Sequence, residues 1–274
     1  MFKRYRPFFR AGAMDTLAYK FNMFSWLIVS ALQVLCVFFL WIGVYNSSTE
    51  EVIHGFTLSE MLVYAAFIAV FNFVTFAGDT MYSISQDIKN GTIAMSFVKP
   101  ISYRVRYIFT TLGGFFMNMV MLGLPAFVLL YVLFSVLGYI VISSVWMFLL
   151  HLMLFVVAQL LAVLLYDCIN YICGVLCFYT TAAWGMNAIK DVVINFLGGT
   201  LIPLSFFPGI FGTIVSYSPF AGLSQNPVLI LIMKMDVVTA LEKIALSVVW
   251  LCALEGIAWL IFRYASKKVT VQGG

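Results

Sequence analysis

Residues 107–136, YIFTTLGGFFMNMVMLGLPAFVLLYVLFSV, form an apolar stretch without a single charged side chain. A helix needs about 20 such residues to cross the roughly 30 Å hydrocarbon core of a bilayer, so this stretch is long enough to span one. The whole chain has the same character, because 64% of its 274 residues are apolar and only 9% are charged. Soluble domains carry about 25% charged residues. We therefore expect an all-α polytopic membrane protein with a single transmembrane domain over residues 1–274.

Five other apolar runs approach the same length, which predicts six transmembrane helices. The six predicted helices are residues 24–45, 58–82, 107–136, 144–166, 190–207 and 238–262. The apolar segment 168–184 is ambiguous, since it can prolong the fourth helix or lie in the inner leaflet.

Two further segments are apolar without being good spanning helices. Residues 1–22 combine a basic start with apolar positions at helical spacing, which predicts an N-terminal helix in the membrane interface. The alternative is an ordinary positively charged flank. Residues 208–236 are apolar but interrupted by glycine, serine and proline, which favours a re-entrant hairpin between spans 5 and 6.

The distribution of Lys and Arg predicts the orientation, because cytoplasmic loops are enriched in both. Twelve of the fifteen fall into three groups that share one side if there are six spans: the N-terminal region, the stretch 85–106 and the C-terminal end. The loop 46–56 carries Glu50 and Glu51 and no Lys or Arg, as expected of an external loop. We expect a multi-pass protein of a plasma membrane, in a bacterium, with both termini in the cytoplasm.

The stretch 85–106, SQDIKNGTIAMSFVKPISYRVR, is then the main cytoplasmic loop. It contains turn and capping residues that predict two very short helices. Ser83 or Ser85 can cap the first, and Asn90-Gly91 can end it in the left-handed conformation. Thr92 can cap the second.

The segment 83–103 can be a simple basic connector, whose Lys and Arg residues only reflect the enrichment of these residues in cytoplasmic loops. Its mixture of charges with apolar side chains instead suggests a docking surface for another protein. The apolar side chains are Ile88, Ile93, Met95 and Phe97.

Two sequence motifs resemble a known family. The pattern D-I-K-N-G-T-I-A-x-x-x-x-K-P-I-x-Y over residues 87–103 resembles the cytoplasmic coupling segment of permease subunits of ATP-binding-cassette exporters, in the type-2 exporter superfamily. GGTLIPLSFFPGIFGTIVSYSPF at 198–220, followed by NPV at 226–228, resembles the end of the fifth span and the external hairpin of that family.

The resemblance implies a permease that forms a dimer with a copy of itself or a related six-span chain, each subunit bound to a separate cytoplasmic ATPase. ATP and Mg would bind that ATPase, and no cofactor is expected in this chain, which has no GxxxxGK[ST] phosphate loop. We expect a transport subunit and not an enzyme, exporting a hydrophobic or amphipathic substrate (drug, peptide or lipid-like), with membrane lipid but no nucleic acid as a further partner. The residues placed by the resemblance at the ATPase contact are Asp87, Ile88, Lys89, Gly91, Thr92 and Ile93.

Ionisable residues within spans are costly and mark candidate sites. Glu255 lies well within the last span and Asp79 near the inner end of the second. They suggest an alternative function, a proton-coupled secondary transporter, although Glu255 can equally form an interhelical hydrogen bond. Phe71 belongs to a phenylalanine cluster that can line a path for an amphipathic molecule, or can simply pack. The cysteines at 168, 173 and 177 lack the pairing of a metal site and are expected to be packing residues.

Overall fold

A computed structural model describes residues 2–18, 20–78, 80–98, 100–140, 144–180 and 183–268 of the chain. The regular structure in these ranges is helical except for one hairpin of β1 (Val52–Ile53) and β2 (Phe56–Thr57). The α-helices are α1 (Phe2–Ala18), α2 (Lys20–Ser47), α3 (Leu58–Thr75), α4 (Thr80–Lys89), α5 (Ile93–Val98), α6 (Tyr103–Asn118), α7 (Leu124–Val136), α8 (Val145–Leu176), α9 (Ala183–Leu197), α10 (Gly209–Ser216), α11 (Gln225–Leu231) and α12 (Val237–Ala265). Shorter turns are the π-helix η1 (Met119–Gly123) and the 3-10 helices η2 (Leu204–Phe206) and η3 (Ser266–Lys268).

Five helical segments are long and apolar enough to cross a membrane, and they correspond to five of the six predicted spans. They are Ile28–Ser47, Leu58–Lys89, Tyr103–Val136, Val145–Leu176 and Val237–Ala265. The second consists of α3 followed by α4, and the third of α6, η1 and α7. The chain is therefore a multi-pass membrane protein.

The predicted fifth span, residues 190–207, differs from the helix found there. Helix α9 begins at Ala183 and ends at Leu197, because Gly199 follows with a φ of +77°, which favours glycine. Its 15 residues rise about 22 Å, less than the roughly 30 Å of hydrocarbon. The rest of the predicted span has irregular backbone.

The ambiguous segment after the predicted fourth span belongs largely to α8, which continues to Leu176. The extension brings Asp167 into the helix, a residue that the shorter predicted span left outside. Burial is also greatest here, since Leu165, Cys168 and Val175 are fully buried.

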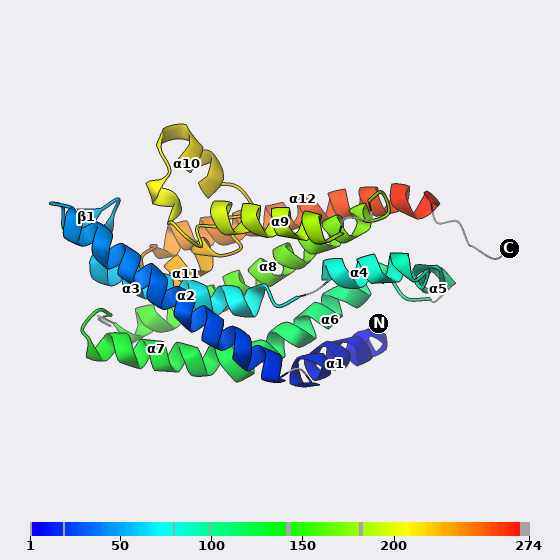
Figure 1. The fold of residues 1–274 in the computed structure, drawn as a ribbon, viewed down its shortest axis with the longest axis horizontal. Coiled ribbons are helices and arrows are strands. Elements are labelled where there is room, and N and C mark those ends of the chain that lie inside the picture. Colours follow the sequence, from blue (N-terminus) through cyan, green and yellow to red (C-terminus); the bar gives the residue numbers. More distant parts are fainter. Residues whose placement is uncertain are drawn as a thin grey trace.

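The helices form one elongated bundle (Figure 1). The start of α1, the segment α4–α5 and the end of α12 lie at the same end of it, on the right in Figure 1, whereas the β-hairpin and the turn after α7 lie at the other end. The chain runs away from the first end in α2, α6–α7 and α9, and returns to it in α3–α4, α8 and α12. We call the end that holds α4 and α5 the inner end, because the distribution of Lys and Arg predicts that it faces the cytoplasm. This orientation stays a prediction.

Helix α3 lies at the centre, packed against α2, α7, α8 and α11. It is apolar on all sides, as expected of a helix buried within a bundle, and Met61, Phe67 and Ile68 are at most 2% exposed. A capping box of Thr57 and Glu60 fixes its start.

The predicted hairpin 208–236 contains two short helices with different surroundings. Helix α10 projects from the bundle in Figure 1, whereas α11 packs against α8 and α3. Gln225 accepts a hydrogen bond from the Leu204 N–H at 2.6 Å, and Tyr64 donates one to the Gly199 carbonyl at 2.6 Å. The two side chains thus provide hydrogen-bond partners for backbone groups outside regular helices. Within a bilayer such groups have no water to bond and need partners from the protein. An external location of the hairpin stays a prediction.

Helix α1 crosses α6 with its backbone almost in contact. A Cβ added at Gly12 would lie 2.0 Å from the Thr110 carbonyl oxygen, and one at Gly113 would lie 1.9 Å from the Phe9 carbonyl oxygen. Small residues permit such close crossings in membrane proteins. Tyr5 stacks on Phe109 at 5.3 Å beside the crossing, so α1 is held against α6 as one unit.

We predict that Gly113→Ala destabilises the protein by about 2 kcal/mol or more, since the added methyl group meets backbone that moves only with a whole helix. The measurement is the midpoint of thermal unfolding in detergent. The matched control is Gly256→Ala on α12, where an added Cβ meets nothing within 4 Å. Equal midpoints for the two variants would contradict the close crossing.

Candidate functional site

Asp87, near the end of α4, connects the α4–α5 segment to the start of α6. Its Oδ2 accepts hydrogen bonds from Tyr103 at 3.0 Å, Tyr107 at 2.9 Å and Arg106 at 2.8 Å. Its Oδ1 accepts one from Thr92 at 2.9 Å. The carboxylate thus closes the loop after α4 and fastens it to two turns of α6.

These contacts change the predicted roles of several residues in this segment. Helix α4 begins at Thr80, earlier than Ser83 or Ser85, and Gly91 ends it with a φ of +70°. The Thr92 hydroxyl is directed to Asp87 instead of capping α5.

The six residues predicted to contact the ATPase fall into different environments. Lys89, Gly91 and Thr92 are exposed, Ile88 is half-buried, and Ile93 is 3% exposed. Ile93 packs in a cluster with Tyr103 and Tyr107, so it supports the segment from within. Lys89 and Met95, which is 61% exposed, form the accessible part.

Arg104, the second residue of α6, makes the central interaction of the inner half of the bundle. Its Nη1 lies 2.5 Å from Asp167 of α8, and its Nη2 lies 2.5 Å from Glu255 of α12. Its Nε donates to both Glu255 oxygens at 3.1 Å, which is the forked geometry that makes arginine pairs strong. Arg104 therefore joins α6, α8 and α12.

Asp167 is the most enclosed member of this group, with a side chain that is 0% exposed. Its second oxygen accepts hydrogen bonds from Thr80 of α4 at 2.5 Å and from Thr111 of α6 at 2.7 Å. Every partner is needed, because a buried carboxylate is tolerated only when it is paired and hydrogen-bonded. We refer to Arg104, Asp167, Glu255, Thr80 and Thr111 as the inner polar network.

The sequence pointed to Glu255 but missed Asp167 and Arg104. Glu255 forms an interhelical ion pair, the simpler of the two interpretations given to it. Asp167 was overlooked because the fourth span was ended at residue 166, although the mostly apolar residues that follow it to Leu176 favour a longer helix. Asp79 lies outside the described residues.

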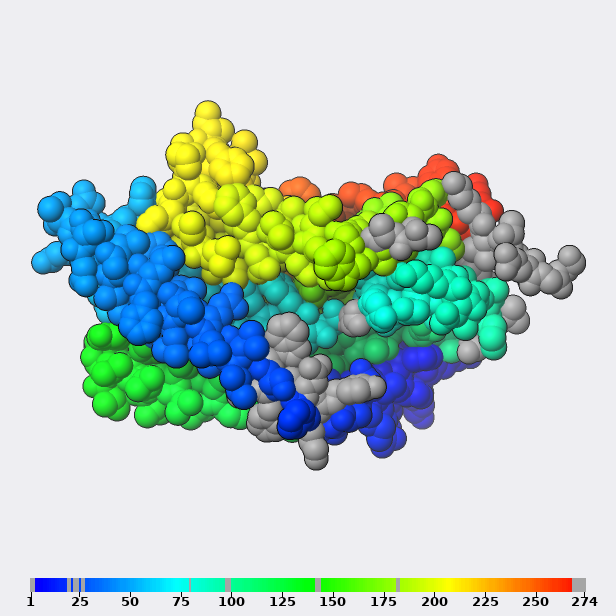
Figure 2. Space-filling view, viewed as in Figure 1, coloured from blue at the N-terminus to red at the C-terminus, as the bar shows by residue number. Residues whose placement is uncertain are grey.

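A cavity of about 1050 Å³ lies between α2, α3 and α9. Figure 2 shows α2 in blue and α9 in yellow-green on one face of the molecule, with the cyan surface of the α3–α4 region between them. Its polar lining residues are Asp15, Thr16, Ser30, Gln33, Asn72, Asn118, Asp191, Asn195 and Thr200, and its aromatic ones are Phe73, Phe76, Tyr166 and Phe196. Such a surface suits a molecule with both apolar and hydrogen-bonding parts.

Asn118 is the most informative polar residue of this lining. Its side chain is 5% exposed, and it makes no hydrogen bond with any of the residues that the structure describes. It immediately precedes the π-helix η1, which adapts the helix to Pro125, a residue without a backbone N–H. Buried amides are normally satisfied, so this one is available to a ligand.

Phe71 does not line this cavity. It is 2% exposed and packs edge-on against Phe155, with ring centroids 4.6 Å apart. Phe73 and Phe76 of the same phenylalanine cluster line the cavity. A role of Phe71 in a transport path stays a prediction.

Lys190 holds α9 beside the cavity. Its ammonium lies 2.5 Å from Asn170 of α8, 3.1 Å from Asp191 and 5.0 Å from the centre of the Tyr166 ring. The lysine neutralises the charge of Asp191 at the cavity wall. Its hydrogen bond to Asn170 holds α9 against α8.

The cysteines are in packing positions. Cys168 and Cys177 are buried and belong to two hydrophobic clusters, and burial raises the pKa of the Cys177 thiol. Among the described residues, no group of three or more His, Cys, Asp or Glu side chains could hold a metal ion.

We predict that Arg104→Gln destabilises the protein by about 3 kcal/mol or more, because it leaves Asp167 buried without its counter-charge. Thermal unfolding in detergent measures the effect. Arg263→Gln, which removes an exposed arginine of α12, is the matched control and should change stability by about 0.5 kcal/mol at most. The double variant Arg104→Gln/Asp167→Asn should recover part of the loss, and a purely additive loss would argue against the pairing.

Comparison with known proteins identifies the family. The sequence profile of the ABC-2 family transporter proteins matches residues 31–273. No curated protein matches the chain. The match covers nearly the whole chain, which therefore belongs to the ABC-2 transporter family, and membership implies a partner ATP-binding subunit.

Proposed function

We propose that this member of the ABC-2 transporter family is the permease subunit of an ATP-driven exporter, which moves a hydrophobic or amphipathic substrate out of the cell. ATP, with Mg, is hydrolysed by a separate cytoplasmic subunit. The α4–α5 segment docks on that subunit, chiefly through Lys89, Gly91, Thr92 and Met95, which are exposed at the inner end.

The observation that carries the proposal is the connection made by Asp87. Movement of α4 and α5 would act on Tyr103, Tyr107 and Arg106 through this carboxylate. The first turn of α6 is therefore the receiving element. A surface loop with no such internal contact would be displaced without moving the spans.

From α6 the displacement passes to α8 and α12 through Arg104, which contacts Asp167 and Glu255. Thr80 links the same network back to α4. A packed network whose polar groups are all hydrogen-bonded favours a few discrete arrangements of the helices over a gradual change of their positions. Coupling between sites in such systems is typically about 1–3 kcal/mol.

The cavity between α2, α3 and α9 is the proposed cargo site. Helix α9 exposes apolar side chains beside it, among them Val192 at 68% and Phe196 at 47%. A second permease subunit, either a copy or a related chain, would cover this side and complete the path. Export as the direction follows from the resemblance of the 87–103 motif to exporter permeases.

The alternative of a proton-coupled transporter rested on Glu255 and Asp79. Glu255 is paired with Arg104, and Asp79 lies outside the described residues. We therefore propose the ATP-driven function alone.

The docking surface is tested by Lys89→Asp/Met95→Asp. We expect the co-purified ATP-binding subunit to fall at least tenfold, which corresponds to about 1.4 kcal/mol of binding free energy, because both side chains lie on the accessible surface of the segment. Glu50→Lys/Glu51→Lys at the opposite end is the control and should leave co-purification unchanged. Transport by the purified chain alone on a proton gradient, without ATP, would contradict the proposal.

The Asp87 connection is tested separately by Asp87→Asn. We expect the ATP-binding subunit to stay bound while substrate transported per ATP falls about tenfold, since the amide cannot act as acceptor for Arg106 and both tyrosines at once. The measurement is the ratio of vesicle transport to phosphate release. An unchanged ratio would show that Asp87 serves only the fold of the loop.

The cargo site is tested by Asn118→Leu. For a cargo that hydrogen-bonds at this amide we expect KM to rise about tenfold, since the lost contact leaves a buried polar group of the cargo unpaired. Co-purification of the ATP-binding subunit should persist. Asn46→Leu, at the exposed end of α2, is the control, and the same rise in KM for both variants would exclude the cavity as the cause.

A further inference from the structure

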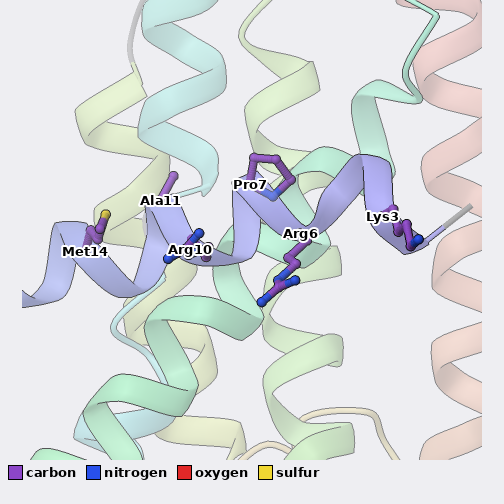
Figure 3. A pocket seen from close by; sticks show the side chains of 6 residues that line it. All are labelled: Lys3, Arg6, Pro7, Arg10, Ala11 and Met14. Atoms are coloured by element: carbon purple, nitrogen blue, oxygen red, sulfur yellow. The ribbon is translucent and has the colours of Figure 1, made fainter.

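Helix α1 carries a row of three cations that neither the inner polar network nor the cavity uses. Lys3, Arg6 and Arg10 follow one another along its exposed side, with Pro7 between the two arginines and Ala11 after Arg10 (Figure 3). With Met14 they border a shallow groove of about 500 Å³. Across the described residues, none of the three cations has a salt-bridge partner. The seven helical steps from Lys3 to Arg10 rise about 10 Å, so the charges are concentrated within two helical turns.

The side of α1 opposite the three cations packs against α6, and this packing determines which way the cations face. Tyr5 is 7% exposed, stacks on Phe109 and accepts a hydrogen bond from the Ser102 N–H at 3.1 Å. The close crossing at Gly12 and Gly113 prevents α1 from rolling on α6. The cations therefore point away from the bundle because of packing.

Along the same side, the character changes from basic to apolar. Beyond Arg10, the exposed apolar residues of α1 at helical spacing are Met14 at 63% and Leu17 at 40%. The change occurs toward α2, whose membrane-spanning part begins at Ile28. Cations followed by apolar side chains along one line match the order of headgroups and acyl chains in a leaflet.

We propose that this face of α1 binds the phosphate headgroup of an anionic phospholipid of the inner leaflet, with the acyl chains lying along Met14 and Leu17. An acidic surface of a soluble protein would match the cations but would leave the apolar end of the row without a partner. Basic clusters on a helix at the membrane surface attract anionic lipid by about 1 kcal/mol for each Lys or Arg. The lipid anchors α1 and, through the close crossing, the position of α6.

The test is a native mass spectrometry titration of the purified chain in detergent with phosphatidylglycerol and, separately, phosphatidylcholine. We expect a higher association constant for the first phosphatidylglycerol than for phosphatidylcholine. Arg6→Gln/Arg10→Gln should lower the phosphatidylglycerol constant about fivefold for each arginine removed, the equivalent of 1 kcal/mol per charge. Arg6→Lys/Arg10→Lys should retain most of it. These residues are exposed, so the folded state should survive, which the thermal midpoint checks.

The matched control is Arg263→Gln/Lys267→Gln, which removes two exposed charges near the end of α12. A decrease equal to that of the α1 variant would overturn the proposal, since it would reflect net charge and not a site. An unchanged phosphatidylglycerol constant in Arg6→Gln/Arg10→Gln would also overturn it, and if the ATP-binding subunit were lost at the same time, the face would be a protein contact. Displacement of the lipid by inorganic phosphate, but not by chloride at equal ionic strength, would assign the groove to a free anion instead.

Discussion

The inner half of this protein depends on the guanidinium group of Arg104. It is the only cation of the described residues within salt-bridge distance of Asp167 and Glu255, and these carboxylates come from α8 and α12. Charges withdrawn from water are tolerated only when their partners are complete. The requirement fixes how α6 sits against α8 and α12, and it extends to α4 because Thr80 donates to the same Asp167. Helix α6, which begins beside Arg104, thus links α4, α8 and α12 at this end of the bundle.

Asp87 makes this arrangement relevant to transport. It precedes Lys89, on the surface proposed for the ATP-binding subunit, by two residues. Three of its hydrogen bonds nevertheless come from side chains of α6. A partner at Lys89 or Met95 would therefore act on α6 through a short, charge-assisted connection. The same helix carries Asn118 at its far end, on the wall of the cavity. One helix hence connects the proposed docking segment with the proposed cargo site, and α1 lies against the middle of it.

Much of the fold could be predicted from the sequence. Long apolar runs favour spanning helices, because a helix satisfies its own backbone hydrogen bonds in a bilayer. Five of the predicted spans correspond to helical segments long enough to cross, although the second was predicted seven residues too short at its end and the fourth ten residues too short. The break at Asn90-Gly91 was also predictable, because left-handed backbone favours these residues. Helix α9 was misplaced because hydropathy does not register that Gly198-Gly199 ends a helix inside an apolar run. The 87–103 motif indicated the family, which the match over residues 31–273 established.

The site was only partly predictable. The sequence by itself determined that the chain crosses a membrane several times, which segments do so and where its cationic surfaces lie, because these follow from local composition and the cost of leaving polar groups in hydrocarbon. Only the tertiary structure decided that Glu255 faces Arg104, that Asp167 belongs with them, and that Phe73 and Phe76 rather than Phe71 reach the cavity. Those pairings join residues far apart in the chain, and a rotation of about 100° per residue determines which side chain faces which neighbour. The packing of helices against one another sets that rotation, and no local pattern encodes it.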